Sequence, residues 1–246
     1  MPSPLSSYVA VAGARRGLDV DLTDPRVVAF AEQFAVDVSQ IDDPVRAGFL
    51  EATGPAAFTA VQAIYVDDFW PRVPAVLGVL DWPEIEPTDA DLWPLLEEFM
   101  REVARLDTLD PVTTELVRLR GARQHDCQIC RSRRSVAAIE QGADEATFDA
   151  VDRYADSDLP DQVKAALALT DAIIWTPYAV PANVLAAADE QLTTDQKVEV
   201  VLHVTRNAAN KIAVALGADA ASVTDGVELF TTDSDGNLTV VDEPSR

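Results

Sequence analysis

The residues best suited to chemistry in this 246-residue chain surround its two cysteines, Cys127 and Cys130. A Cys-x-x-Cys pair places two thiols about one helical turn apart, where they can close a disulfide, so that one thiol can resolve an intermediate formed on the other. A disulfide framework would call for a shorter chain with more cysteines. The spacing therefore predicts a redox dithiol, and two small buried hydrophobic residues are the alternative.

Several neighbours could activate such a dithiol, because a thiol attacks only as the thiolate. Cys127 follows Asp126 at an expected helix start, where unpaired backbone N–H groups favour negative charge. Arg131, Arg133 and Arg134 follow the motif, and at helical spacing they can lie over the face that carries the thiols. We therefore expect Arg131 and Arg134 to be auxiliary residues of the site.

Glu115 is a second candidate for the site. Helical periodicity over the expected helix 110–124 places this carboxylate inside the apolar arc, facing inward. Burial would raise its pKa toward that of a general base. An ion pair with Arg118 or Arg123 is the alternative, and periodicity alone does not decide between the two roles.

The two histidines, His125 and His203, are candidates for proton transfer. His125 lies just before the dithiol, and its role stays open at this level. His203 lies on an apolar helix face, which is typical of a hydrogen-bonded core residue. A structural zinc site needs four ligands, and the sequence offers neither a second cysteine pair nor closely spaced histidines, so we expect no metal. No glycine-rich phosphate or dinucleotide loop predicts a cofactor.

The elements that position these residues are predicted to be almost all helical. Gly142 and Gly217 supply left-handed stops for two of them. Only Val227–Thr232 and Leu238–Val241 alternate around a turn, which predicts a short C-terminal β-hairpin. The expected helices span residues 92–106, 110–124, 126–142, 144–156, 161–175, 181–190 and 194–216.

A Pro- and acid-rich segment, Asp81–Asp91, is predicted to be a linker. Residues 69–78 before it align with residues 208–217 at a constant offset, matching at Arg/Lys, Val/Ile and Leu-Gly. Either two related helical lobes or chance similarity between two helix ends explains this repeat. The predicted division is an N-terminal lobe with linker at 1–90, a core at 91–220 and a tail at 221–246.

Charge and hydropathy exclude several classes of function. The chain has 42 acidic against 19 basic residues, a net charge of −23, so phosphate backbones and anionic membranes are unsuitable partners. No apolar run approaches the roughly 20 residues of a membrane span, and the N-terminus lacks a secretory-leader pattern. We therefore expect a cytoplasmic globular protein with 48% hydrophobic residues around a sizeable core.

The segment Glu115-Leu-Val-Arg-Leu-Arg-Gly-Ala-Arg-Gln-His-Asp-Cys127-x-x-Cys130 resembles the Glu-x11-Cys-x-x-Cys signature of the alkylhydroperoxidase D (AhpD)-like branch of the carboxymuconolactone decarboxylase family. Residues 165–172 and 198–217 also resemble that family, so the likeness covers about 110–220. It implies an all-α AhpD-like fold, homo-oligomers, and reduction of a small hydroperoxide or disulfide. It further implies that Cys130 is the peroxidatic thiol, that Cys127 resolves it, that Glu115 serves a proton relay, and that a lipoyl-bearing protein or another thiol donates electrons.

One position departs from the family pattern. The family has histidine four residues after the second cysteine, where this chain has Arg134, and arginine cannot accept a proton at neutral pH. Either Glu115 alone activates Cys130, or the protein carries out another dithiol reaction. Two other hypotheses stay open, a non-redox decarboxylase-type enzyme and a helical binding or assembly protein with inert cysteines.

Overall fold

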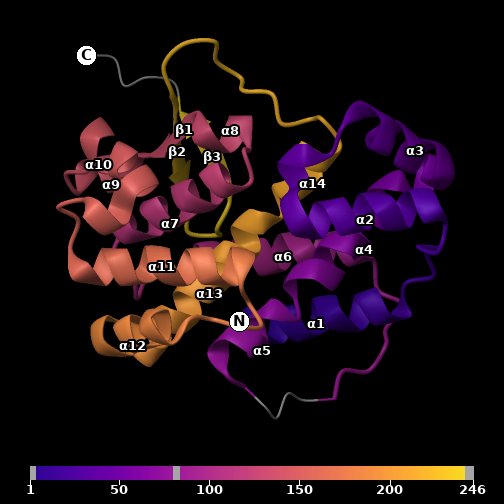
Figure 1. Cartoon of the computed structure of the whole chain (residues 1–246), viewed down its shortest axis with the longest axis horizontal. Helices are drawn as coiled ribbons and strands as arrows, with labels where there is room; N and C mark the ends of the chain where they lie inside the picture. Colours follow the sequence, from indigo (N-terminus) through magenta and orange to yellow (C-terminus); the bar gives the residue numbers. More distant parts are fainter. Residues whose placement is uncertain (1–3, 80–83, 242–246) are drawn as a thin grey trace.

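Helices make up most of the chain in a computed structural model that describes residues 4–79 and 84–241 (Figure 1). A small sheet near the C-terminus is the β part, so the prediction of an all-α class with a short β element is confirmed. The α-helices are α1 (Pro4–Gly17), α2 (Pro25–Asp37), α3 (Asp43–Thr53), α4 (Ala57–Phe69), α5 (Arg72–Leu77), α6 (Leu92–Ala104), α7 (Pro111–Gln124), α8 (Gln128–Arg131), α9 (Val136–Glu140), α10 (Glu145–Asp149), α11 (Asp161–Trp175), α12 (Ala182–Gln191), α13 (Thr194–Ala208) and α14 (Lys211–Ala215). Short 3-10 helices are η1 (Val38–Gln40), η2 (Gly54–Ala56) and η3 (Ala150–Asp156).

Helix α13 lies at the centre of the molecule, packed against α5 and α6 on one side and α7 and α11 on the other (Figure 1). Polar caps begin the helices that carry the site: the Asp110 carboxylate accepts from the backbone N–H of Thr113 at 2.9 Å, and Thr193 forms a capping box with Gln196. The buried apolar residues of both halves form one continuous cluster. The helix that carries Glu115 is thus fixed against the central one.

The C-terminal hairpin is confirmed, and it belongs to a larger sheet than predicted. Strands β2 (Glu228–Thr232) and β3 (Leu238–Val241) pair antiparallel, and β2 also pairs in parallel with β1 (Arg133–Ser135). The predicted single helix 126–142 is therefore wrong: α8, β1 and α9 replace it. The cause is non-local, because β2 arrives from the far end of the chain and its Glu228 N–H donates to the carbonyl of Ser132 at 2.8 Å.

Two further helices are shorter than predicted. The segment 194–216 divides into α13 and α14, and 144–156 divides into α10 and η3. The predicted left-handed glycine stops are confirmed, with φ of 94° at Gly142 and 68° at Gly217.

The two segments with similar sequence follow the same local path. In each, a long helix (α4 or α13) ends, a short helix follows (α5 or α14), and a glycine of positive φ closes it, Gly78 at 66° and Gly217 at 68°. A division into two lobes stays a prediction. Asp81–Pro83 of the predicted linker lie outside the described residues. The rest of the linker forms neither helix nor strand before α6 begins. A hydrogen bond connects it to α1, in which the Thr88 N–H donates to the carbonyl of Gly13 at 3.0 Å.

Within the two described ranges, no helix combines the length and the apolar character that crossing a bilayer requires.

Candidate functional site

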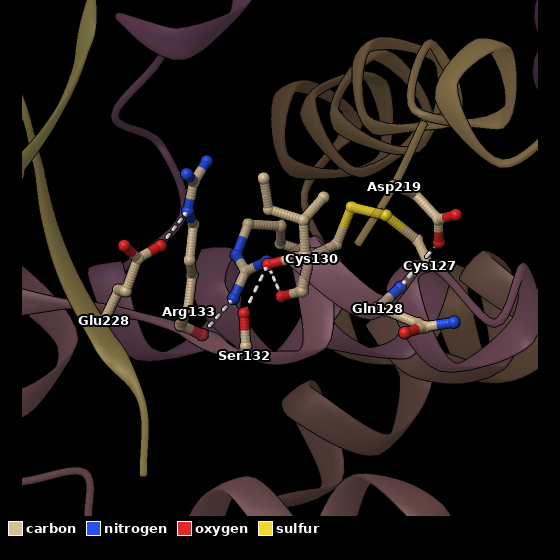
Figure 2. Close-up of a disulfide and its surroundings, with 9 residues drawn as sticks. Cys127, Gln128, Cys130, Ser132, Arg133, Asp219 and Glu228 are labelled. Atoms are coloured by element: carbon tan, nitrogen blue, oxygen red, sulfur yellow. Dashed lines mark hydrogen bonds and ion pairs between the residues drawn. A yellow bond between two sulfur atoms is a disulfide. The ribbon is translucent and has the colours of Figure 1, made fainter. Parts of the chain in front are cut away.

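Cys127 and Cys130 form a disulfide across the single turn of α8 (Figure 2). Their Cα atoms are 5.3 Å apart, a distance usual for disulfides. The structure thus contains the bond that the Cys-x-x-Cys spacing permits. Both residues are buried, with 1% of Cys127 and 6% of Cys130 exposed. A reagent in solution therefore has restricted access to this sulfur pair.

The backbone around the disulfide is held by residues far away in the sequence. Asp126 adopts a left-handed φ of 50°, which turns the chain out of α7, and the Cys127 N–H donates to the carbonyl of Ala122 at 3.0 Å. Asp219 takes the first amides of α8: its carboxylate accepts from Gln128 N–H and its carbonyl from Ile129 N–H, each at 2.9 Å (Figure 2). The expectation of unpaired amides beside Cys127 is thus wrong, because Asp219 caps them.

Glu115 faces inward as predicted, with 2% of the residue exposed, and it forms the ion pair with Arg118. The pair is bidentate, with Arg118 Nε and Nη2 each 2.7 Å from a Glu115 oxygen, and the backbone N–H of Ser135 donates to the same carboxylate at 3.2 Å. Arg118 also donates to the carbonyl of Cys130 at 2.7 Å and to that of Arg133 at 2.8 Å. This pair, the Glu115–Arg118 clamp, joins α7 to the disulfide turn and to β1.

The three arginines that follow the motif are each neutralised by an acid. Arg134, which stands where the resembled family has histidine, is 5% exposed, and its guanidinium lies 5.2 Å from the ring centroid of Phe148. Charge pairing of this kind weakens the positive field expected at the sulfur atoms. The ion pairs are Arg131 with Asp126, Arg133 with Glu228 (Figure 2) and Arg134 with Glu145.

His125 ends α7 and is buried 6.1 Å from Phe69, ring centroid to ring centroid, in an edge-on contact. Burial, and then the positive charges of Lys211 and Arg72, lower its pKa well below the ordinary value of a histidine. His203 is also buried, as predicted for a core residue, and burial lowers its pKa too. Both side chains are thus neutral at physiological pH.

We expect the folded protein to lose stability below about pH 6.5, the ordinary pKa of histidine in an unfolded chain. Below this pH the unfolded chain binds a proton at His125, whereas the buried side chain in the folded protein stays neutral. This difference lowers the free energy of unfolding by about 1.4 kcal/mol per pH unit for that residue. Urea unfolding of the native protein and of the His125→Gln variant, from pH 7.5 to pH 5, measures the effect. The variant should lose less stability on acidification, and two parallel curves would contradict the prediction.

Sequence reasoning missed a cavity of about 500 Å³ beside the Glu115–Arg118 clamp. His203, Arg206 and Asn207 of α13 line it together with the clamp, and neither cysteine is among its lining residues. The sequence does contain a signal for its polar wall. Polar residues follow one another along one helix face at spacings of four, three and one: Glu199, His203, Arg206 and Asn207.

Among the described residues, no group of three or more histidine, cysteine, aspartate or glutamate side chains could hold a metal ion.

Comparison with known proteins finds two similar chains from strains of Mycobacterium tuberculosis, both called uncharacterized proteins, MT2376 and Rv2313c. Each is 40% identical over an alignment of 225 residues, which covers 85% of this chain and 78% of the relative. No family model matches the sequence. No solved structure matches it either.

Proposed function

This chain belongs to one family with the uncharacterized proteins MT2376 and Rv2313c of Mycobacterium tuberculosis, and we propose that it is a thiol–disulfide oxidoreductase whose redox group is the Cys127–Cys130 dithiol. The relatives' names assign no activity, so the proposal rests on the site. The observation that carries it is the disulfide between two cysteines one helical turn apart, in a chain with only two cysteines.

The proposed cycle is balanced by two substrates. The Cys130 thiolate attacks the terminal oxygen of a small hydroperoxide, the O–O bond breaks, and the alcohol leaves with a proton. The resulting sulfenic acid condenses with the Cys127 thiol and releases water. With a small disulfide as oxidant, a mixed disulfide forms instead and Cys127 displaces the second thiol. An external dithiol, such as a lipoyl-bearing protein, then reduces the Cys127–Cys130 bond.

The surroundings leave the Cys130 thiol without the free relay base that the resemblance implies. Glu115, the relay base implied by the resemblance, is held by two hydrogen bonds from Arg118, and Arg134 is directed to Glu145. We assign Glu115 a positioning role, because it fixes the guanidinium that holds the carbonyl of Cys130. A Glu115→Gln variant separates the two roles: loss of a relay base changes the pH profile of oxidation, whereas loss of positioning slows oxidation equally at every pH.

The fully reduced protein should re-form one intramolecular disulfide when mixed with cumene hydroperoxide or with oxidised glutathione. We expect faster disulfide formation in the folded protein than in urea, because the fold holds the two thiols in bonding distance. Alkylation followed by mass spectrometry measures the reaction.

The single variants Cys127→Ser and Cys130→Ser are the matched controls, since each keeps one thiol and neither can close the bond. Cys130→Ser should abolish the reaction with either oxidant, and Cys127→Ser should accumulate a mixed disulfide with glutathione. Thiols that stay reduced in folded protein while the unfolded chain oxidises would overturn the proposal.

Burial of the two cysteines favours a second candidate, a helical binding or assembly protein with inert sulfur. At 1% and 6% exposure the two side chains contribute to the core as small hydrophobes do. That function predicts that the thiols of the folded native protein stay reduced in the oxidation assay, and that a Cys127→Ala/Cys130→Ala variant keeps its fold and its partners.

The rest of the proposal comes from the resemblance. It includes an AhpD-like arrangement of the helices and a homo-oligomer, whose mass light scattering would give. A cytoplasmic setting, which we expect from the sequence and not from the resemblance, completes the proposal, because thiols are kept reduced there and a dithiol can cycle.

A further inference from the structure

The cavity beside the clamp has the size of a small-molecule site, about 500 Å³. It lies between α7, α13 and the sheet, and its wall combines charged groups with an apolar side made by Leu106, Leu109 and Phe230. Glu115 and Arg118 form part of the wall, but their charges neutralise one another. Further polar groups of the wall are on α13: His203, Arg206 and Asn207.

Arg206 carries a positive charge that no carboxylate balances among the described residues. Its Nε donates to the carbonyl of Met100 at 2.8 Å and its Nη1 to the amide oxygen of Asn207 at 3.3 Å, both neutral acceptors. Burial and the nearby Arg118 guanidinium lower the pKa of Arg206 to about 10, which still leaves it charged at neutral pH. A buried cation without a counterion is costly, so this wall favours an anion in the cavity.

A buried nitrogen atom of the same wall, Nδ2 of Asn207, also has no hydrogen-bond partner in the described part of the chain. The amide NH₂ of Asn207 is an obligate donor, and its oxygen is already taken by Arg206. An unsatisfied buried donor costs free energy that an incoming oxygen atom would recover. Charge and hydrogen bonding therefore favour the same kind of ligand.

We propose that this cavity binds a small organic acid, with its carboxylate on Arg206 and Asn207 and its apolar body against Phe230, Leu106 and Leu109. A single negative charge suits the wall, because Arg206 supplies one positive charge and the exposed carboxylates of Asp107 and Asp110 repel a more highly charged anion. The site is distinct from the disulfide, since neither cysteine lines the cavity.

Calorimetric titration with hexanoate tests the proposal, with hexan-1-ol as the uncharged match and inorganic phosphate as the anion without an apolar body. Hydrogen bonds to a charged group predict that hexanoate binds at least roughly tenfold more tightly than hexan-1-ol. Phosphate should bind more weakly than hexanoate. Equal binding of the acid and the alcohol, or tighter binding of phosphate, would overturn the proposal.

Two variants locate the site. Arg206→Gln should weaken hexanoate roughly tenfold or more and leave hexan-1-ol unchanged, while Arg101→Gln on the exposed face of α6 should change neither. Asn207→Asp is the second variant, because it supplies an internal counterion to Arg206. It should abolish hexanoate binding and raise the melting temperature. Hexanoate binding that persists in Asn207→Asp would show that the ligand lies elsewhere.

Discussion

Replacing Arg118 with methionine is expected to lower the free energy of unfolding by about 3–5 kcal/mol. The substitution leaves the Glu115 carboxylate, whose side chain is 2% exposed, as a buried charge without its counterion. It also removes the hydrogen bonds that hold the carbonyls of Cys130 and Arg133. Urea denaturation at pH 7 measures the loss, followed by circular dichroism.

The chain contains a matched control. Glu98 and Arg101 on α6 repeat the same order and spacing as Glu115 and Arg118, but their side chains are 37% and 35% exposed. Arg101→Met should cost no more than about 1 kcal/mol, as is usual for surface ion pairs. The double variant Glu115→Gln/Arg118→Met should recover much of the loss, because no buried charge remains. Equal losses in Arg118→Met and Arg101→Met would contradict the argument.

Local periodicity predicted that Glu115 faces inward but could not choose its partner. Arg118 and Arg123 both lay within reach of the carboxylate on the expected helix, and the outcome depends on segments outside it. Arg118 donates to the carbonyls of Cys130 and Arg133. Arg123 instead forms ion pairs with Asp149 on α10 and Asp152 on η3. Tertiary contacts of this kind leave no periodic signal in one helix.

The strand β1 shows the same limit from the side of the fold. Arg133, Arg134 and Ser135 have no apolar alternation, and the segment becomes a strand because β2 provides a hydrogen-bonding edge. The C-terminal hairpin itself was predictable because both strands and their turn are contiguous. Helix stops at Gly142 and Gly217 were predictable for a similar reason, since a left-handed residue is a local requirement.

Asp68 is the second residue at which a single substitution should have a large effect. Its carboxylate, whose side chain is 6% exposed, pairs with Arg72 and with Lys211, the Lys211 Nζ lying 2.7 Å away. These cations occupy equivalent positions in the two similar segments 69–78 and 208–217, and both lie over the ring of Phe69. One buried acid thus pairs with the equivalent cation of each segment.

We therefore expect Asp68→Asn to lower the free energy of unfolding by about 3–5 kcal/mol at pH 6, where both cations are charged. The loss should shrink on going to pH 9. Burial lowers the pKa of Lys211 to about 8 in the native protein, against about 10.4 in an unfolded chain, and losing Asp68 lowers it further. The variant then sheds the lysine proton at a lower pH than the native protein does, and above about pH 8 neither carries this charge. The folded variant thus gains stability relative to the native protein as the pH rises.

Asp67→Asn is the control for this experiment, because the neighbouring Asp67 forms a half-exposed pair with Arg15. It should cost no more than about 1 kcal/mol at either pH. A loss for Asp68→Asn that is the same at pH 6 and pH 9 would mean that Lys211 keeps its proton without Asp68. Asp68 would then not be the group that keeps Lys211 charged in the native protein.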